Sequence, residues 1–146
     1  MKNLKVKEVY HYLTKTAPVL KSGSSIKEVI SLLLRDPFSR SVYIIDDNEF
    51  LVGIISTLQL MKLTHLLKGH KTMQKNDIYN AVKISKARIA GDIMHPPVYV
   101  YETDIVFDIL DKMIQEDFQE LPVVNKDKKV IGDLNCLEII QGLWEE

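Results

Sequence analysis

The chain has 146 residues, enough for one domain or for a pair of small lobes with an ordinary hydrophobic core. Hydrophobic residues make up 46% and charged residues 27%, which excludes disordered, fibrous and collagen-like classes. The net charge of -1 does not indicate a dedicated nucleic-acid binder, and the single cysteine, Cys136, allows no intramolecular disulfide. The single cysteine fits a reducing, cytoplasmic compartment. No apolar run approaches the ~18 residues of a membrane span, so we expect a soluble protein.

The first half of the chain predicts an extended segment, a helix, a hairpin and a second helix. Ser25 and Glu28 have the spacing of a capping box, and a one-sided apolar pattern follows until Pro37. Two apolar runs then flank a polar turn, as in a hairpin, and Ser56 and Gln59 form a second capping box. The expected elements cover residues 18–21, 26–36, 42–45, 51–55 and 57–67.

The second half predicts the same order of elements. Thr103 or Asp104 is expected to cap its first helix, and Asn135 with Glu138 to cap its last. The expected extended segment, helix, hairpin strands and final helix begin at residues 97, 105, 121, 130 and 136.

An internal repeat explains this agreement. The segment 41–46 matches 120–125, and the same offset of 79 residues holds without a gap across more than forty positions. Each copy is a β-α-β-β-α unit of about 55–60 residues, a size that is marginal in isolation, so the copies are expected to pack on each other. The chain is therefore divided into a first repeat, a basic connector and a second repeat at 5–62, 63–87 and 88–144.

The duplicated pattern resembles the CBS domain family, named for cystathionine beta-synthase, in the tandem form called a Bateman module. The motifs that carry the resemblance are Asp92-Ile93-Met94 with Pro97-Val98, Leu121-Pro122-Val123-Val124, Val130-Ile131-Gly132, and their first-repeat counterparts around Pro18-Val19, Val42–Asp46 and Val52–Ser56. The resemblance implies an α/β (α+β) fold in which two β-α-β-β-α repeats pack through their sheets as a pseudo-two-fold pair. It also implies a regulatory role, with AMP, ADP, ATP or S-adenosylmethionine bound in clefts between the repeats.

The ligand signature of the family is a glycine, then Ser or Thr three residues on, then Asp three further. The hydroxyl and the helix N-terminus offer an anion site, and the carboxylate can accept hydrogen bonds from ribose hydroxyls. In the first repeat Ser56 keeps the hydroxyl and Gln59 replaces the carboxylate. In the second, Asn135 replaces the hydroxyl and Glu138 keeps a longer carboxylate. Plain helix capping, without any ligand, explains the same residues equally well.

Two further positions follow from the resemblance. Arg40 precedes the central strand, where family members often direct a basic residue at ligand phosphates; a solvent-exposed arginine is the alternative. His95 lies in the segment that contacts adenine through its backbone in the family; a turn residue is the alternative. The candidate ligand-binding residues are Thr16, Pro18, Val19, Arg40, Ser56, Thr57, Gln59, His95, Pro97, Val98, Asn135 and Glu138.

The sequence thus predicts a stand-alone regulatory homodimer that binds an adenine nucleotide, needs no cofactor and signals to a partner protein. The two clefts are expected to be unequal, the first favouring phosphorylated ligands and the second adenosine or S-adenosylmethionine. One alternative is a scaffold dimer with empty clefts. Another is binding of RNA or single-stranded DNA by the connector, where only Tyr79 accompanies the lysines. An enzyme is the least expected class, because no phosphate-loop, dinucleotide, zinc-protease or nucleophile-elbow motif occurs.

Overall fold

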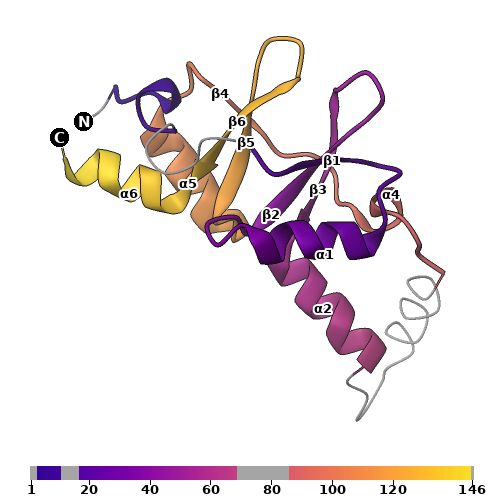
Figure 1. Ribbon diagram of the computed structural model, residues 1–146. Coiled ribbons are helices and arrows are strands. Elements are labelled where there is room, and N and C mark those ends of the chain that lie inside the picture. Colours follow the sequence, from indigo (N-terminus) through magenta and orange to yellow (C-terminus); the bar gives the residue numbers. More distant parts are fainter. Residues whose placement is uncertain (1–2, 11–16, 69–85, 146) are drawn as a thin grey trace.

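The computed structural model describes residues 3–10, 17–68 and 86–145, and within these ranges the chain forms two three-stranded sheets (Figure 1). In each sheet the first strand is parallel to the second, and the second is antiparallel to the third. The first sheet contains β1 (Val19–Lys21), β2 (Ser41–Ile45) and β3 (Leu51–Ser56). The second contains β4 (Val100–Tyr101), β5 (Glu120–Val124) and β6 (Val130–Asn135).

Helices complete both repeats in the expected order, so the predicted β-α-β-β-α fold is confirmed. The helices of the described ranges are η1 (Val6–Glu8, a 3-10 turn), α1 (Ile26–Arg35), α2 (Thr57–Lys68), α4 (Ala90–Ile93), α5 (Val106–Glu116) and α6 (Cys136–Trp144). None of them is long and apolar enough to span a membrane.

Most of the predicted helix caps are present, and one is wrong. Ser25 Oγ accepts a hydrogen bond from Glu28 N at 3.1 Å, which begins α1. Thr103 or Asp104 was expected to begin α5 in the same way, but this helix starts at Val106 and its N-cap, Ile105, contributes no side-chain bond. The Asp104 carboxylate instead accepts from Tyr101 N at 2.8 Å. It closes the turn after β4, because an aspartate can bond to nearby backbone as readily as it caps a helix.

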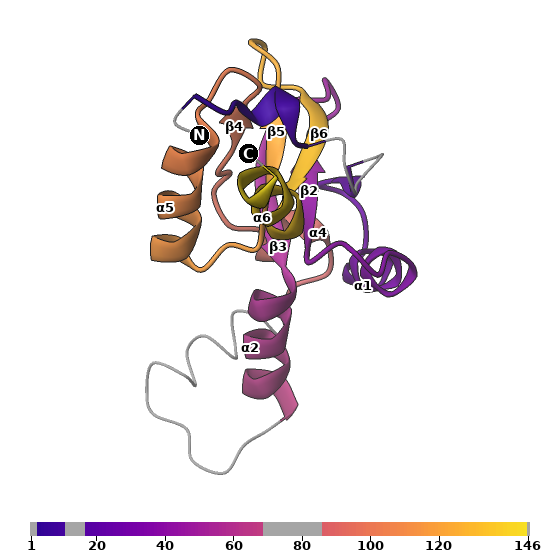
Figure 2. The same ribbon diagram turned by 90° about the vertical axis from the view of Figure 1, so that its left-hand side faces the viewer.

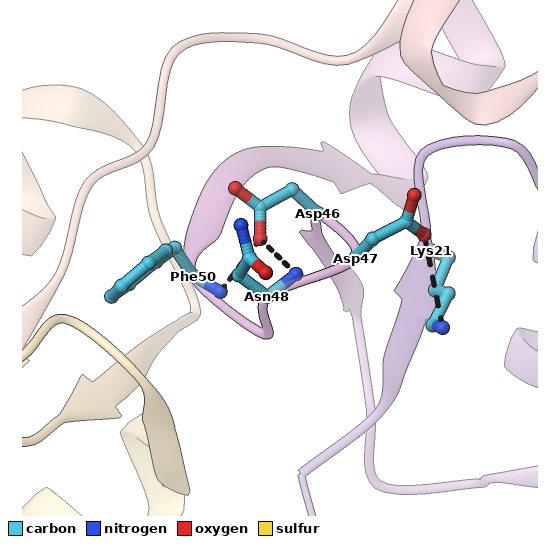
Figure 3. Close-up of polar contacts among 5 residues, drawn as sticks. All are labelled: Lys21, Asp46, Asp47, Asn48 and Phe50. Atoms are coloured by element: carbon cyan, nitrogen blue, oxygen red, sulfur yellow. Dashed lines mark hydrogen bonds and ion pairs between the residues drawn. The ribbon is translucent and has the colours of Figure 1, made fainter.

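The two hairpin turns have the same side-chain chemistry. Asp46 Oδ1 accepts from Asn48 N at 2.9 Å and from Phe50 N at 3.0 Å, as Figure 3 shows. In the second repeat, Asn125 Oδ1 makes the equivalent two bonds, both at 3.0 Å, to backbone amides of its own turn. The Lys21–Asp47 ion pair beside the first turn, at 3.8 Å, is exposed and therefore contributes little stability.

The tips of the two hairpins join the repeats. Leu51 N donates a hydrogen bond to Lys128 O at 3.0 Å, and Phe50 and Lys129 form an isolated β-bridge. The ammonium of Lys129 also lies 5.7 Å from the centre of the Phe50 ring, within the range of a cation–π contact. The hairpins are therefore held together by backbone and side-chain contacts.

The repeats also exchange the segments that precede their first strands. Residues 3–10 pack on the second repeat (Figure 2). There, Val6 N donates to Asp104 O at 3.0 Å. Reciprocally, residues 89–95 pack on the first repeat, where Ala90 N donates to Ser24 O at 2.7 Å and Ala90 joins the apolar core. Each repeat thus depends on the other for part of its core.

Two glycines leave the space that the exchanged segments occupy. A side chain at Gly53 of β3 would overlap Met94, and a side chain at Gly132 of β6 would overlap Tyr10. These are the glycines of the predicted ligand signature. Their position shows that the absence of a side chain has a packing role in both repeats, whatever binds in the clefts.

Candidate functional site

A cavity of about 420 Å³ lies between α2 and the segment that enters from the second repeat. We call it the α2 pocket. Its helical wall is formed by residues 59, 60, 62, 63 and 66 of α2. The polar side chains that line it are those of Gln59, Lys62, Asp92 and His95. Its volume is in the range of small-molecule sites, which is roughly 300–1,000 Å³.

The first turn of α2 is fixed by a reciprocal capping box. Gln59 N donates to Ser56 Oγ at 3.2 Å, and Ser56 N donates to Gln59 Oε1 at 2.9 Å. The capping interpretation of this pair is therefore confirmed. It does not remove Gln59 from the site, since the half-buried side chain also lines the α2 pocket.

The opposite wall comes from the other repeat. His95 N donates to Ile54 O at 2.9 Å, and Ile54 N donates to His95 O at 3.0 Å. This pairing continues the first sheet by one bridge and brings His95 to the pocket that Gln59 lines. Pro97 and Val98 lie shortly after it and are half-buried. Val98 packs against the core of the second repeat and against the apolar cluster around Tyr43 and Val124, to which both repeats contribute. The pocket is thus composite, with one wall from each repeat.

Arg40 lies in a neighbouring cavity of about 270 Å³, which we call the junction pocket. Ser56 and Thr57 line it from the first repeat, and residues 117–119 line it from the second. The guanidinium of Arg40 is exposed, and its Nη1 donates to Pro37 O at 3.0 Å and to Ser39 O at 3.1 Å. Arg40 is therefore held by its own loop, next to the N-terminus of α2.

The signature residues of the second repeat face the interior. Asn135 and Glu138 are buried, and Asn135 N donates to Glu138 Oε1 at 2.9 Å. Asn135 Oδ1 accepts from Leu137 N at 2.8 Å, while its Nδ2 donates to Phe38 O of the first repeat at 3.0 Å. These side chains cap α6 and connect the repeats. Glu138, which is 0% exposed, is enclosed by the fold.

The remaining predicted residues lie in or just before the first strand of the first repeat, or outside the described ranges. Pro18 is buried, and its carbonyl accepts from Tyr43 N at 2.8 Å. Val19 is half-buried and pairs with Tyr43 in the parallel ladder between β1 and β2. Thr16 lies outside the described residues, as does most of the basic connector with Tyr79.

Sequence reasoning missed a set of buried ionisable groups where the repeats join. Glu120 and Asp133 are each 1% exposed, and the Tyr43 hydroxyl, also buried, donates to the Asp133 carboxylate. The repeat offset carries a signal for them, because Glu120 aligns with Ser41 and Asp133 with Ile54. A carboxylate that replaces a hydroxyl or an apolar residue inside a strand is costly to bury, and so marks a special environment.

The comparison with protein families matches the CBS domain twice, over residues 6–65 and 90–144. Among curated proteins, the CBS domain-containing protein CBSX2, chloroplastic, of Arabidopsis thaliana is 28% identical over 137 residues. The matched region covers 85% of this chain and 57% of that relative. The chain therefore spans less than two thirds of the length of this curated protein.

Solved structures show the same fold. A CBS domain-containing protein from Thermotoga maritima has a TM-score of 0.83 and 30% identity, covering 99% of this chain and 96% of its own. CBSX2 in complex with AMP has a TM-score of 0.72 and 23% identity, covering 97% and 96%. The CBS domain pair of protein MJ0100, in complex with 5′-methylthioadenosine and S-adenosyl-L-methionine, has a TM-score of 0.72 and 21% identity, covering 97% of each chain.

Two family matches account for most of the chain, and they coincide with the two sheets and their helices. The exchanged segments, the paired hairpins and the composite pocket follow from this duplication. The chain belongs to the CBS domain family and is a tandem pair of its domains.

Proposed function

We propose that the chain is a non-catalytic regulatory module that binds an adenine nucleotide in the α2 pocket and signals to a partner protein. The composite construction of the pocket is the observation that carries this proposal. Gln59 and Lys62 come from the first repeat, Asp92 and His95 from the second. A ligand held by both walls binds one arrangement of the repeats better than others, and this differential affinity is what shifts a conformational equilibrium. No resident cofactor is needed for such a role.

The chemistry of the lining suggests how a nucleotide would lie. Lys62 is a point cation suited to a phosphate group. Asp92 lies across the pocket, is exposed, and offers a carboxylate that can accept hydrogen bonds from ribose hydroxyls. It would replace the aspartate of the family signature, whose position is occupied here by Gln59. Ile55 and Met94 offer apolar surface for the base. Complexes of the fold relatives with AMP, 5′-methylthioadenosine and S-adenosyl-L-methionine are consistent with ligands of this class.

The lowered pKa of Asp92 supports its use as a charged acceptor. Hydrogen bonds from the backbone amides of Arg88 and Ile89 hold the pKa of Asp92 below its ordinary value. Its carboxylate is therefore ionised and oriented before any ligand arrives. Such preorganisation reduces the entropy that binding would otherwise cost.

A direct titration tests the proposal. Calorimetry with AMP, ADP, ATP and S-adenosylmethionine on the full chain is expected to give one binding site per chain for at least one of them. Thermal-shift measurements with the same ligands are expected to show a matching rise in Tm, since a ligand that binds only the folded state stabilises it. No heat and no shift with any of the four would favour the alternative of a scaffold with empty clefts.

We also propose that the chain forms a homodimer through the helices of its repeats. Leu34 of α1 is 81% exposed and Trp144 of α6 is 86% exposed. Between α1 and α2 lies an open groove of about 850 Å³ with a predominantly apolar lining. Exposed apolar surface of this kind marks an interaction site, and a second copy is the partner that the repeat architecture favours.

A cytoplasmic location remains our proposal, although the curated relatives are named chloroplastic.

A further inference from the structure

Four buried ionisable side chains meet where the two repeats join. Tyr43 comes from β2 of the first repeat, while Glu120, Asp133 and Glu138 come from β5, β6 and α6 of the second. Burial of this many acidic groups is unusual, because an ionised carboxylate loses its hydration inside a protein. Among the described residues, no group of three or more acidic, histidine or cysteine side chains is arranged to hold a metal ion. The acids therefore need another explanation.

Their hydrogen bonds connect the second repeat to the first. Tyr43 OH donates to Asp133 Oδ1, and Arg40 N donates to Glu120 Oε1. Glu120 and Asp133 also act on each other, and the buried Glu120 Oε2 accepts no hydrogen bond from a donor among the described residues. Two neighbouring carboxyl groups can form a hydrogen bond only if one of them carries a proton, since an ionised carboxylate is purely an acceptor.

We propose that Glu120 and Asp133 share one proton. While it is bound, both carboxyl groups can keep their hydrogen bonds to Arg40 N and Tyr43 of the first repeat, so the stability of the junction between the repeats depends on pH. The protonated Glu120 donates to Asp133, whose ionised carboxylate accepts from both Glu120 and Tyr43. Removal of the proton leaves two carboxylates facing each other in a buried place. Their repulsion then acts on the strands that hold the repeats together.

Burial and the neighbouring acids favour retention of the proton. Burial first, and the negative charge of Asp133 second, raise the pKa of Glu120 to about 9. Burial also raises the pKa of Asp133 to about 6, against the opposing hydrogen bonds from Tyr43 and Glu120. The described titratable and charged groups that face the pair are Tyr43 on β2, Asp36 and Arg40 on the connection from α1 to β2, and Glu138 on α6.

These neighbours act in both directions. Asp36 and Glu138 are acidic, and both raise the pKa of Asp133. The hydrogen bonds from Tyr43 and from Arg40 N lower the pKa values of the carboxyl groups that accept them. The pKa of Tyr43 lies well above its ordinary value, chiefly because of burial, so its hydroxyl remains a donor. Arg40 acts through its backbone amide, while its guanidinium donates to carbonyls of its own loop.

The sign of the pH effect follows from the raised pKa values. Above the ordinary pKa of a glutamate, the unfolded chain has lost this proton while the folded chain keeps it. The stabilising contribution is therefore complete below the ordinary pKa of 4.5 and is lost as the pH rises to about 9. Each pH unit in which the folded state holds one additional proton lowers the folding equilibrium constant about tenfold.

The test is urea unfolding of the wild-type chain, Glu120→Gln and Glu116→Gln across the range from about pH 6 to about pH 9, set by the two pKa values. Glutamine keeps the size of Glu120, and its amide can donate to Asp133 and accept from Arg40 N without any titration. The advantage of Glu120→Gln over wild type is expected to grow with pH. Glu116, on the surface of α5, provides the matched control, and its variant should follow wild type.

Infrared spectroscopy provides a second readout that does not depend on the variant's stability. The folded wild-type chain at neutral pH is expected to show the carbonyl band of a protonated carboxylic acid, which titrates away in alkali and is missing in Glu120→Gln. Parallel pH profiles for wild type and Glu120→Gln would overturn the proposal. Absence of the protonated-acid band from the folded wild type would overturn it as well, even if Glu120→Gln fails to fold.

Discussion

His95 and Ile54 exchange two backbone hydrogen bonds, at 2.9 and 3.0 Å, although they belong to different repeats. Through this bridge, the loop before β4 becomes a wall of the pocket that begins at the N-terminus of α2. A ligand in the pocket therefore contacts both repeats at once. This gives the regulatory proposal a physical basis, since such a ligand can favour one relative arrangement of the repeats over another.

Lys62→Ala is expected to weaken AMP binding about tenfold or more, because a hydrogen bond to a charged group contributes roughly 1.5–3 kcal/mol. Adenosine, which lacks the phosphate, should bind both proteins equally. Calorimetry with the two ligands measures the difference. Lys112→Ala, an exposed lysine on α5, is the matched control and should bind AMP like wild type. A loss of AMP affinity in Arg40→Ala without one in Lys62→Ala would indicate that the phosphate binds in the junction pocket, and would contradict this orientation.

Gly53→Ala is expected to lower stability by about 1–3 kcal/mol, the usual cost of overpacking a close contact. The new methyl group would overlap Met94 and displace the segment that carries His95. Ligand affinity should fall together with stability, because the same segment forms a pocket wall. Gly23→Ala is the control, since a methyl group there meets no atom within 4 Å. Urea unfolding of both variants measures the effect, and equal stability would argue against the tight exchange of segments.

Glu138→Ala is expected to destabilise the chain without weakening AMP binding. The substitution removes the acceptor for Asn135 N, and a buried donor left without a partner costs about 1–3 kcal/mol. Since Glu138 is enclosed, it does not line the α2 pocket. Denaturation and AMP titration of the same sample separate the two effects, with Glu116→Ala as an exposed control. A variant that keeps full stability but loses AMP affinity would show that Glu138 binds the ligand.

The double variant Leu34→Glu and Met61→Glu is expected to be monomeric, whereas the wild-type chain should be dimeric. Both side chains are exposed apolar groups that line the groove between α1 and α2. Two carboxylates there would oppose burial against a second copy. Light scattering over a wide concentration range measures the change. Ile131→Glu introduces the same charge on β6 and should leave the dimer intact. A wild-type particle mass of 16.8 kDa at every concentration would contradict the dimer proposal.

The order of elements was predictable because the same sequence pattern occurs in both repeats. Ser25 with Glu28, Ser56 with Gln59 and Asn135 with Glu138 are local patterns, and all three act within one helical turn. The predicted cap of α5 was wrong, because the Asp104 carboxylate bonds to Tyr101 N in the preceding turn rather than to the helix. Such a competition is decided by small energy differences that the sequence pattern does not show.

The site was only partly predictable. Signature spacing located Gln59, and the family segment located His95, but the grouping of residues by repeat did not show that they share one pocket. The exchange of segments is a long-range event, and no periodicity within 3–10 or 89–95 identifies the sheet that each will join. Likewise, the spacing of Glu138 matches the ligand signature, yet burial at the junction is a tertiary property that spacing does not reveal.

Hydrogen–deuterium exchange with and without AMP tests the central claim, that one nucleotide pocket is built from both repeats. The composite pocket predicts that AMP slows exchange together in residues 54–63 and 92–98, while 133–141, at the enclosed second signature, are little changed. Lys112→Ala should reproduce this pattern, and Lys62→Ala should need more AMP to reach it. Protection confined to 133–141, or to a single wall of the pocket, would contradict the account.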